Sequence, residues 1–284
     1  MKLKGKVAIV SAVGRGIGKA IALKPAEEGT KVVVNSFREE TTRRVVAEIT
    51  QKGGEAIGVP GDISEVAMVK ETVAKAIEIY GKINILINNV GGVKVDETED
   101  MSDPLGAAEA LWNGCFNLNM KAPVLMIEAV TPHFKEQKSG KIINMASVVG
   151  RPWSALPESV ITPPAAYGAM KSALIRYTQY LADVLGPHNI NVNAICPGLI
   201  YTDAWKAGSE QIVQFHPKYQ GQDPREWFLG IFDLKYMDEF PVVTPLRREQ
   251  TVEDIANTAL FLVSEEACNI TGQSINVDGG MSKA

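Results

Sequence analysis

The segment YGAMK places a tyrosine and a lysine four residues apart, at Tyr167 and Lys171. Apolar residues at helical spacing predict a helix over 167–185, so both side chains project from one face of it. A tyrosine is a poor acid–base group near pH 7, because the pKa of its phenol is about 10. A lysine ammonium a few ångströms away stabilises a phenolate by roughly 4 kcal/mol at an effective dielectric constant of 20, enough to lower that pKa by about three units. The pair therefore predicts proton transfer to a substrate, and the alternative is a core tyrosine beside a solvated lysine.

A glycine-rich turn near the amino terminus, SAVGRGIG over 11–18, lies between a predicted strand and a helix that begins near Gly16. The free N–H groups and the positive dipole end of a helix N-terminus bind a pyrophosphate when the backbone can approach it closely. Gly16 and Gly18 allow that approach because they carry no side chain. We expect a nucleotide at this turn, and the alternative is a tight strand-to-helix connection without a ligand.

Two arginines flank the expected ribose position of that nucleotide. A carboxylate at the end of the second strand accepts hydrogen bonds from the ribose hydroxyls of NAD and repels a 2′-phosphate. This chain has Ser36 there, followed by Arg38, and Arg15 lies in the glycine turn. Guanidinium groups pair well with phosphate oxygens, so NADP(H) is favoured over NAD(H). The alternative is that Arg38 only begins a charged surface helix.

Strand-like and helix-like segments alternate along the chain. Short runs rich in Val, Ile and Ala predict buried strands over 6–12, 31–37, 55–62, 83–89, 140–147 and 190–198. Helical spacing of apolar residues is found over 39–52, 64–80 and 167–185. This order predicts an α/β fold with a Rossmann-like, doubly wound parallel sheet and a ligand crevice at the carboxyl ends of the strands. We expect one domain, 1–284, with long connections over 91–112, 148–166 and 203–245 at that crevice, the last of them an extended substrate lid.

Composition narrows the class of partner. A net charge of −4 and a pI near 5.6 give no basic footprint for nucleic acid. No apolar run approaches the roughly 18–20 residues that a membrane span needs. The three cysteines are scattered and the three histidines lie far apart, so we expect a reducing, cytoplasmic environment, no metal site and a small-molecule partner.

These segments together resemble the short-chain dehydrogenase/reductase family of the single-domain YxxxK type. The resemblance covers nearly the whole chain, from the glycine turn, similar to TGxxxGxG, to NITGQSINVDGG over 269–280. It implies NAD(P)-dependent hydride transfer that interconverts a secondary alcohol and a ketone. The turn departs from the pattern at Ala12, where a glycine is usual, and a β-carbon costs roughly 1–2 kcal/mol if that position needs a positive φ. We expect weakened but retained nucleotide binding, and Ala12 is the one feature that favours a nucleotide-sensing or scaffold protein without turnover.

The resemblance also implies a catalytic set of Asn119, Ser147, Tyr167 and Lys171. In it, the tyrosine is the general acid/base, the lysine lowers its pKa and holds the nicotinamide ribose, the serine hydrogen-bonds the substrate oxygen, and the asparagine anchors a relaying water. Ser147 lies 20 positions before the tyrosine, more than is usual, so Ser154 and Ser159 stay open as alternatives.

Cofactor contacts follow from the same resemblance. Asp62 and Ile63 are expected to flank the adenine, and NNVG over 88–91 supports the ribose side. The expected cofactor-binding residues are Ser11, Gly14, Arg15, Gly16, Ile17, Gly18, Ser36, Arg38, Asp62, Ile63, Asn89, Gly91, Tyr167, Lys171, Pro197, Gly198, Ile200 and Thr202.

The lid segment is rich in aromatic residues, with eight of the chain's 19 between positions 204 and 240. Such a wall predicts a bulky apolar or cyclic ketone, for example a steroid-like or aromatic one. The alternative is that the rings form the lid's own core or pack on another subunit. A 3-oxoacyl thioester is the alternative substrate, although four basic against six acidic residues in this segment argue mildly against a carrier protein. The resemblance implies a homodimer or homotetramer.

Overall fold

The computed structural model describes residues 1–94, 102–151, 165–238 and 244–283. Within them, seven parallel strands form one sheet in the order β3-β2-β1-β4-β5-β6-β7. The strands are β1 (Val7–Val10), β2 (Lys31–Ser36), β3 (Glu55–Pro60), β4 (Ile85–Asn88), β5 (Gly140–Met145), β6 (Ile190–Pro197) and β7 (Ser274–Val277). The order reverses between β1 and β4, which opens a crevice at their carboxyl ends. The predicted doubly wound parallel sheet is confirmed.

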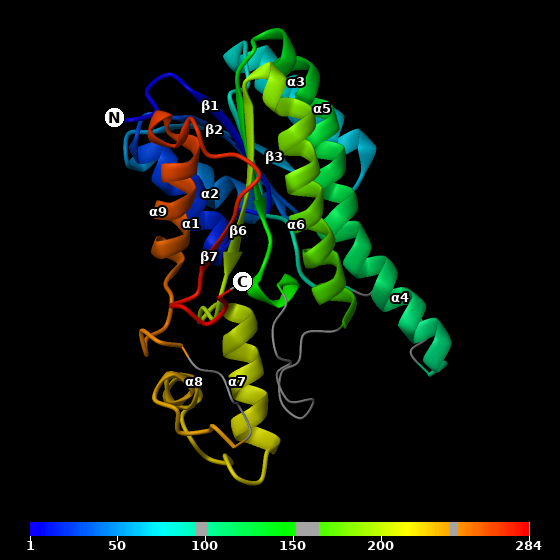
Figure 1. The fold of residues 1–284 in the computed structure, drawn as a ribbon, viewed down its shortest axis with the longest axis vertical. Helices are drawn as coiled ribbons and strands as arrows, with labels where there is room; N and C mark the ends of the chain where they lie inside the picture. The colour runs from blue at the N-terminus through cyan, green and yellow to red at the C-terminus, as the bar shows by residue number, and fades with distance from the viewer. Residues whose placement is uncertain (95–101, 152–164, 239–243, 284) are drawn as a thin grey trace.

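Helices cover both faces of the sheet (Figure 1). One apolar core lies between the sheet and α1 (Gly16–Glu27), α2 (Glu39–Gln51) and α9 (Val252–Val263). A second core lies on the opposite face, under α3 (Val66–Tyr80), α5 (Ala122–Glu136) and α6 (Ala165–Leu185). The strands are apolar on both sides because both sides are covered, and every residue of β1 is buried.

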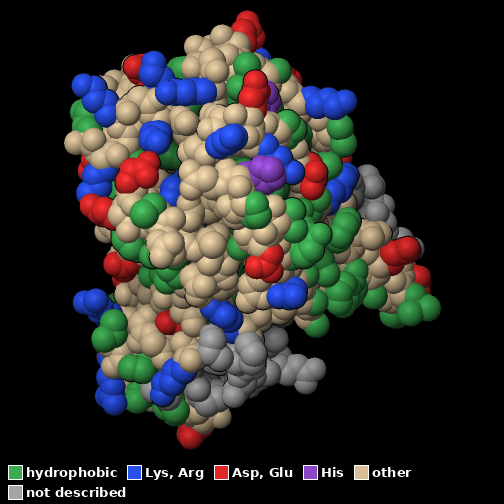
Figure 2. Space-filling view, turned by 45° about the horizontal axis from the view of Figure 1, so that its top comes forward, with side chains coloured by type: hydrophobic (Ala, Val, Ile, Leu, Met, Phe, Trp, Pro, Cys, Tyr) green, Lys and Arg blue, Asp and Glu red, His purple; other side chains and the backbone are tan. Residues whose placement is uncertain are grey.

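The first of the three expected long connections contains a helix that the apolar spacing did not predict. α4 (Pro104–Phe116) begins at Asp103, whose carboxylate accepts hydrogen bonds from the N–H groups of Leu105 and Gly106. It continues through a π-helical turn (Asn117–Lys121) into α5. α4 lacks the expected pattern because its large apolar side chains Leu105, Trp112 and Phe116 are exposed, at 82%, 45% and 49%. They recur at spacings of seven and four residues, and hydrophobic side chains gather at the lower right of Figure 2.

The segment beyond β6 holds two helices, α7 (Asp203–Phe215) and α8 (Pro224–Phe232). They lie beyond the carboxyl edge of the sheet, at the bottom of Figure 1. Among the described residues, no helix is long and apolar enough to cross a bilayer. Within the same residues, no three His, Cys, Asp or Glu side chains come together as metal ligands.

Candidate active site

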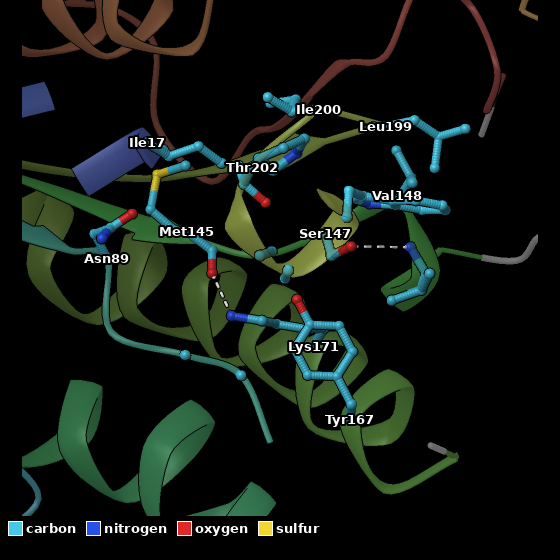
Figure 3. Close-up of a pocket in the computed structure, with 18 residues that line it drawn as sticks. Ile17, Asn89, Met145, Ser147, Val148, Tyr167, Lys171, Leu199, Ile200 and Thr202 are labelled. Atoms are coloured by element: carbon cyan, nitrogen blue, oxygen red, sulfur yellow. Dashed lines mark hydrogen bonds between the residues drawn. The ribbon is translucent and has the colours of Figure 1, made fainter. Parts of the chain in front are cut away.

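A cavity of about 340 Å³ lies at the carboxyl ends of the central strands, under the first turn of α7. Figure 3 shows the side chains that line it. The predicted site residues among them are Ile17, Asn89, Gly91, Ser147, Tyr167, Lys171, Pro197, Gly198, Ile200 and Thr202. Segments up to 188 positions apart in the chain, from Ile17 to Trp205, therefore meet here, as the topology of a parallel sheet requires.

Tyr167 and Ser147 line the same cavity. Tyr167 stands in the first turn of α6, and the neighbouring hydroxyl of Ser147 acts to lower the pKa of its phenol. Ser147 follows β5 and caps the 3₁₀ turn Val148–Gly150, where its Oγ accepts a hydrogen bond from the N–H of Val149 at 3.3 Å. The alternatives Ser154 and Ser159 lie outside the described residues. Among the described residues, Ser147 is the serine that shares the cavity with the tyrosine.

Lys171 lies one helical turn after Tyr167 and is 2% exposed. Its Nζ donates a hydrogen bond to the carbonyl oxygen of Met145 at 2.7 Å and lies 5.5 Å from the centre of the tyrosine ring. Burial disfavours the ammonium form and lowers the pKa of Lys171 to about 8. The lysine is therefore held by the backbone of β5 and faces the tyrosine from the side.

The expected lowering of the tyrosine pKa was wrong for this structure. Burial disfavours the phenolate and raises the pKa of Tyr167 to about 12, although the hydrogen bond with Ser147 acts in the opposite direction. Two physical reasons account for the difference. The lysine donates to a carbonyl oxygen rather than to the phenol, and its own burial weakens its charge at alkaline pH.

Asn119 is buried in the π-helical turn between α4 and α5. Its amide nitrogen donates to the carbonyl oxygens of Gly92 at 2.7 Å and Cys115 at 2.8 Å, and its oxygen accepts from the N–H of Gly92 at 3.1 Å. A β-carbon at Gly91 would lie 2.8 Å from the Nζ of Lys171 and 2.9 Å from the Oδ1 of Asn119. The asparagine therefore fixes the loop after β4, and this loop approaches the lysine so closely that only glycine fits.

The glycine turn has the backbone geometry of an anion site. α1 starts without a side-chain cap and without an acidic residue in its first turn, so its first N–H groups are available to a phosphate. Gly16 has a φ of +52°, and a β-carbon at Gly18 would lie 2.2 Å from the carbonyl oxygen of Ala12. Ala12 has a φ of +55°, which lies in the left-handed region. Its β-carbon therefore costs the expected conformational free energy of roughly 1–2 kcal/mol. The Nδ2 of Asn89 donates to its carbonyl oxygen at 3.0 Å and holds the strained turn in place.

Comparison with known proteins agrees with this geometry. The model of the short chain dehydrogenase family matches residues 6–212. The chain belongs to the short-chain dehydrogenases. A second model, described as enoyl-(acyl carrier protein) reductase, matches residues 230–282. The protein is therefore an NAD(P)-dependent oxidoreductase that acts on CH–OH and keto groups.

Curated relatives match this short-chain dehydrogenase from end to end. It is 33% identical to subunit BbsD of the (2S)-[(R)-hydroxy(phenyl)methyl]succinyl-CoA dehydrogenase of Thauera aromatica, over 99% of this chain and 98% of the relative. It is 34% identical to a 3-oxoacyl-[acyl-carrier-protein] reductase of Staphylococcus epidermidis, over 97% and 98% of the two chains.

Solved structures with ligands share the fold. A 7α-hydroxysteroid dehydrogenase in complex with NADH and 7-oxo glycochenodeoxycholic acid has a TM-score of 0.77 and 31% identity, covering 100% of this chain and 96% of that one. An L-sorbose reductase of Gluconobacter frateurii in complex with NADPH and L-sorbose has a TM-score of 0.84 and 28% identity, covering both chains fully.

Two of the predicted cofactor residues, Ser11 and Ile63, have side chains buried in the fold of this short-chain dehydrogenase. Ser11 is fully buried, and its hydroxyl accepts hydrogen bonds from the N–H groups of Asn89 at 3.1 Å and Val90 at 3.2 Å. Ile63 is 3% exposed and packs into the core under α3. Both side chains support the loops around the cavity, and the expected contacts of these two residues with a cofactor stay predictions.

At the expected ribose end, the structure adds a residue that the sequence did not single out. Arg44 of α2 donates a hydrogen bond to the carbonyl oxygen of Gly14 at 2.9 Å. Beside it, the hydroxyls of Ser36 and Thr41 are 2.8 Å apart. Arg44 belongs to the charged run REETTRR, which is typical of a surface helix, so the sequence did not mark it as a site residue. Its spacing of three residues from Thr41, which puts both on one helix face, was the signal that could have indicated it.

The other charged groups at this end are partly engaged. Arg15 pairs with Asp203, the first residue of α7, at 3.0 Å. Arg38 caps the start of α2 with its backbone and is exposed. The carboxylate of Asp62 accepts hydrogen bonds from Ser64 and lies 3.7 Å from the ammonium of Lys94. Arg38 and Asp62 thus follow the carboxyl ends of β2 and β3, whereas Arg15 points toward α7.

Apart from Trp205, the described aromatic residues of the lid do not line the cavity. Tyr219, Trp227, Phe228, Phe232 and Tyr236 are buried in a core of the lid itself, which continues to Val148 and Leu199. Trp227 and Tyr236 stack at 5.7 Å. The expectation that this wall indicates a bulky substrate is therefore corrected, and the alternative of a lid core holds.

The substrate end of the cavity is lined instead by a smaller apolar set. It consists of Val148, Val149, Leu199, Ala204 and Trp205. Of the lid's tryptophans, Trp205 lines the cavity, and its ring lies edge-on to Phe228. Trp112 of α4 is not among the lining residues, and Trp153 and Phe240 lie outside the described residues.

Proposed function

We propose that the protein is an NADP(H)-dependent oxidoreductase that interconverts a secondary alcohol and a ketone with Tyr167 as general acid/base. The observation that carries this proposal is that Ser147, Tyr167 and Lys171 line one cavity, with the lysine one helical turn after the tyrosine. The nicotinamide supplies or accepts the hydride when it is bound. Because the pKa of Tyr167 is about 12, its phenol is protonated at neutral pH and can donate a proton to a carbonyl oxygen.

The other residues have supporting roles in this proposal. Ser147 donates a hydrogen bond to the substrate oxygen from its place beside the tyrosine in the cavity. Lys171 is an ammonium below about pH 8, where it favours negative charge on the phenol oxygen during proton transfer. Asn119 holds Gly91 and Gly92 against the lysine.

A substitution of Tyr167 tests this role. Tyr167→Phe removes the transferable proton and is expected to lower kcat by 10²–10⁴-fold with an unchanged dissociation constant for the nucleotide. Tyr177→Phe on the same helix is the matched control and should leave kcat within twofold. Equal turnover of Tyr167→Phe and the wild type would reject the proposal.

The preference for NADP(H) rests on the positive groups around the end of β2. No acidic residue lies within β2, where a carboxylate would meet the ribose hydroxyls. Arg15, Arg38 and Arg44 lie near that end, and the sorbose reductase with the same fold is a complex with NADPH. The steroid dehydrogenase is a complex with NADH, so the fold alone does not decide the cofactor.

Titration with NADPH and with NADH, followed by nicotinamide fluorescence, tests this preference. We expect NADPH to bind at least tenfold more tightly, and Arg38→Leu to weaken NADPH about tenfold with little effect on NADH. Arg43→Leu is the matched control, because Arg43 lies in the same helix and pairs with Glu39. Equal affinities for the two nucleotides would overturn the cofactor assignment.

The apolar lining by Val148, Val149, Leu199 and Trp205 supports a ketone with an apolar group next to the reacting carbon. We keep the cyclic ketone as one candidate. A 3-oxoacyl thioester is the second, because two relatives at 33% and 34% identity carry names of thioester oxidoreductases. Initial rates with a cyclic ketone and with a short 3-oxoacyl-CoA distinguish them, and a tenfold higher kcat/KM identifies the class.

We also propose that the protein forms a homo-oligomer through the exposed apolar stripe of α4, Leu105, Trp112 and Phe116. Exposed rings at this spacing favour a helix–helix contact. Sedimentation equilibrium is expected to give a dimer or tetramer, and Trp112→Glu should dissociate it. A monomeric wild type at micromolar concentration would reject this assembly.

A further inference from the structure

Arg151 directly follows the 3₁₀ turn that Ser147 caps. Its side chain extends from this turn to β7. Its Nε donates to the Oδ1 of Asn276 at 3.1 Å, and its Nη2 donates to the carbonyl oxygen of Ser274. These contacts join positions 125 and 123 residues apart in the sequence. The guanidinium therefore ties the loop after β5 to the last strand of the sheet.

A third interaction reaches β6, the strand between them. The guanidinium of Arg151 and the N–H of Ser147 both act to lower the pKa of the buried Cys196 thiol against the effect of its burial. Cys196 directly precedes Pro197 and Gly198, which line the cavity. Both ends of the segment from Ser147 to Arg151 therefore lie near β6.

The same turn is held on its other side by α6. A β-carbon at Gly150 would lie 2.7 Å from the carbonyl carbon of Lys171, and the hydroxyl of Ser172 donates to the carbonyl oxygen of Gly150 at 2.8 Å. The turn is therefore attached to the helix of Tyr167 and Lys171 by one side and to β6 and β7 by the other. Its two attachments define where the hydroxyl of Ser147 lies relative to the phenol.

The partners of the guanidinium are neutral. A carbonyl oxygen and an amide oxygen accept its hydrogen bonds, and among the ion pairs of the described residues none involves Arg151. Charge pairing is thus not what the arginine contributes. Its planar fork reaches two acceptors of β7 at once, which a lysine ammonium cannot reproduce in the same geometry.

We infer that Arg151 is a positioning residue that holds the hydroxyl of Ser147 against Tyr167. The inference rests on the proposed roles of Ser147 and Tyr167. Arg151 itself does not line the cavity and acts only through the turn. Removing its fork frees the 148–150 turn from β7, so the serine hydroxyl samples positions away from the phenol.

The effect has a signature in the pH dependence of alcohol oxidation. The hydrogen bond with Ser147 lowers the pKa of Tyr167 against the effect of burial. When that bond is lost, the phenol holds its proton to higher pH, so the rise of kcat/KM for oxidation with pH moves to higher pH.

The experiment compares Arg151→Met with Ser147→Ala, with the double variant and with a control. Arg151→Met is expected to lower kcat at least tenfold, to leave the dissociation constant of NADPH within threefold, and to move the pH profile in the same direction as Ser147→Ala. The double variant should be no slower than Ser147→Ala alone, because both changes remove one interaction. Arg176→Met is the matched control, since Arg176 is an exposed arginine of α6 bonded to Gln179.

Two further variants keep the inference testable if Arg151→Met folds poorly. Arg151→Lys should behave like Arg151→Met, and Asn276→Ala, which removes one acceptor, should lower kcat about two- to fivefold. If Arg151→Met lowers the melting temperature but keeps the wild-type kcat and pH profile, the inference is overturned. Arg151 would then contribute to stability alone. A normal pH profile in Ser147→Ala would instead contradict the proposed function.

Discussion

The two sides of the cavity are built on different principles. The sheet side, formed by the glycine turn, Asn89 and Lys171, consists of backbone held in rare conformations and of polar groups with fixed partners. The lid side, formed by α7 and α8, is an aromatic core that exposes one tryptophan to the cavity. Polar groups with fixed partners suit a constant cofactor, whereas a lid with its own core can vary at its inner surface and keep its fold. The comparison shows that an aromatic-rich segment next to a site can contribute mainly to the stability of the fold rather than to substrate binding.

The largest expected effect is on the stability of the lid. Trp227 is fully buried, so Trp227→Ala should lower the free energy of unfolding by about 3–5 kcal/mol. Trp205→Ala, at the cavity, should cost far less stability and change KM for the ketone. Urea denaturation and steady-state kinetics of both variants measure the contrast. Equal losses of stability would mean that the lid lacks a core separate from the cavity.

Lys171 tests the sheet side, where function is expected to oppose stability. The pKa of Lys171 falls from 10.5 in the unfolded chain to about 8 in the fold, so the unfolded state binds more protons between these values and stability rises with pH there. Below pH 8, burial of the ammonium form lowers the free energy of unfolding by about 3 kcal/mol. The hydrogen bond to the carbonyl oxygen of Met145 offsets part of this loss.

Lys171→Met should therefore abolish turnover and yet raise the free energy of unfolding at pH 7 by about 2 kcal/mol. The gain over the wild type should vanish by about pH 10.5, where the unfolded lysine is also neutral. Urea melts at pH 7 and pH 10 give the two values. Parallel pH dependences of variant and wild type would contradict the assigned pKa.

Ala12 sharpens the comparison at the glycine turn. Its positive φ costs roughly 1–2 kcal/mol, and a glycine gives back about half of that through its greater freedom in the unfolded chain. Ala12→Gly is thus expected to stabilise the protein by about 0.5–1 kcal/mol and to tighten nucleotide binding a few-fold. Thermal melts and fluorescence titration measure both, and a weaker affinity would show that the alanine methyl contacts the nucleotide.

The smallest effect is expected where the two sides meet, at the ion pair of Arg15 and Asp203. Both side chains are largely exposed, at 77% and 61%, so the pair adds little stability. Asp203→Asn should free Arg15 for a 2′-phosphate and lower the dissociation constant of NADPH two- to fivefold, with no change for NADH. Titration at low and at high salt checks this, because the gain should shrink with screening. Weaker NADPH binding would mean that Asp203 orients the arginine rather than competing for it.

Several elements could be predicted from the sequence because their signals are local. The strand predicted over 31–37 is observed at Lys31–Ser36, and the helix predicted over 39–52 at Glu39–Gln51. α4 was missed because its apolar face is exposed rather than buried. The π-helical turn at Asn119 has no spacing signal either, because it depends on how α4 and α5 pack.

The sequence by itself determined the order of strands and helices, the strand–turn–helix of the glycine turn and the shared face of Tyr167 and Lys171. These features depend on neighbours within a few residues, where spacing and glycine positions act directly. Only the tertiary structure decided that the lid rings point inward, that Arg15 meets Asp203, and that burial raises the pKa of Tyr167. Each of these depends on which distant segments exclude water from a side chain, and that exclusion is a property of the packed fold.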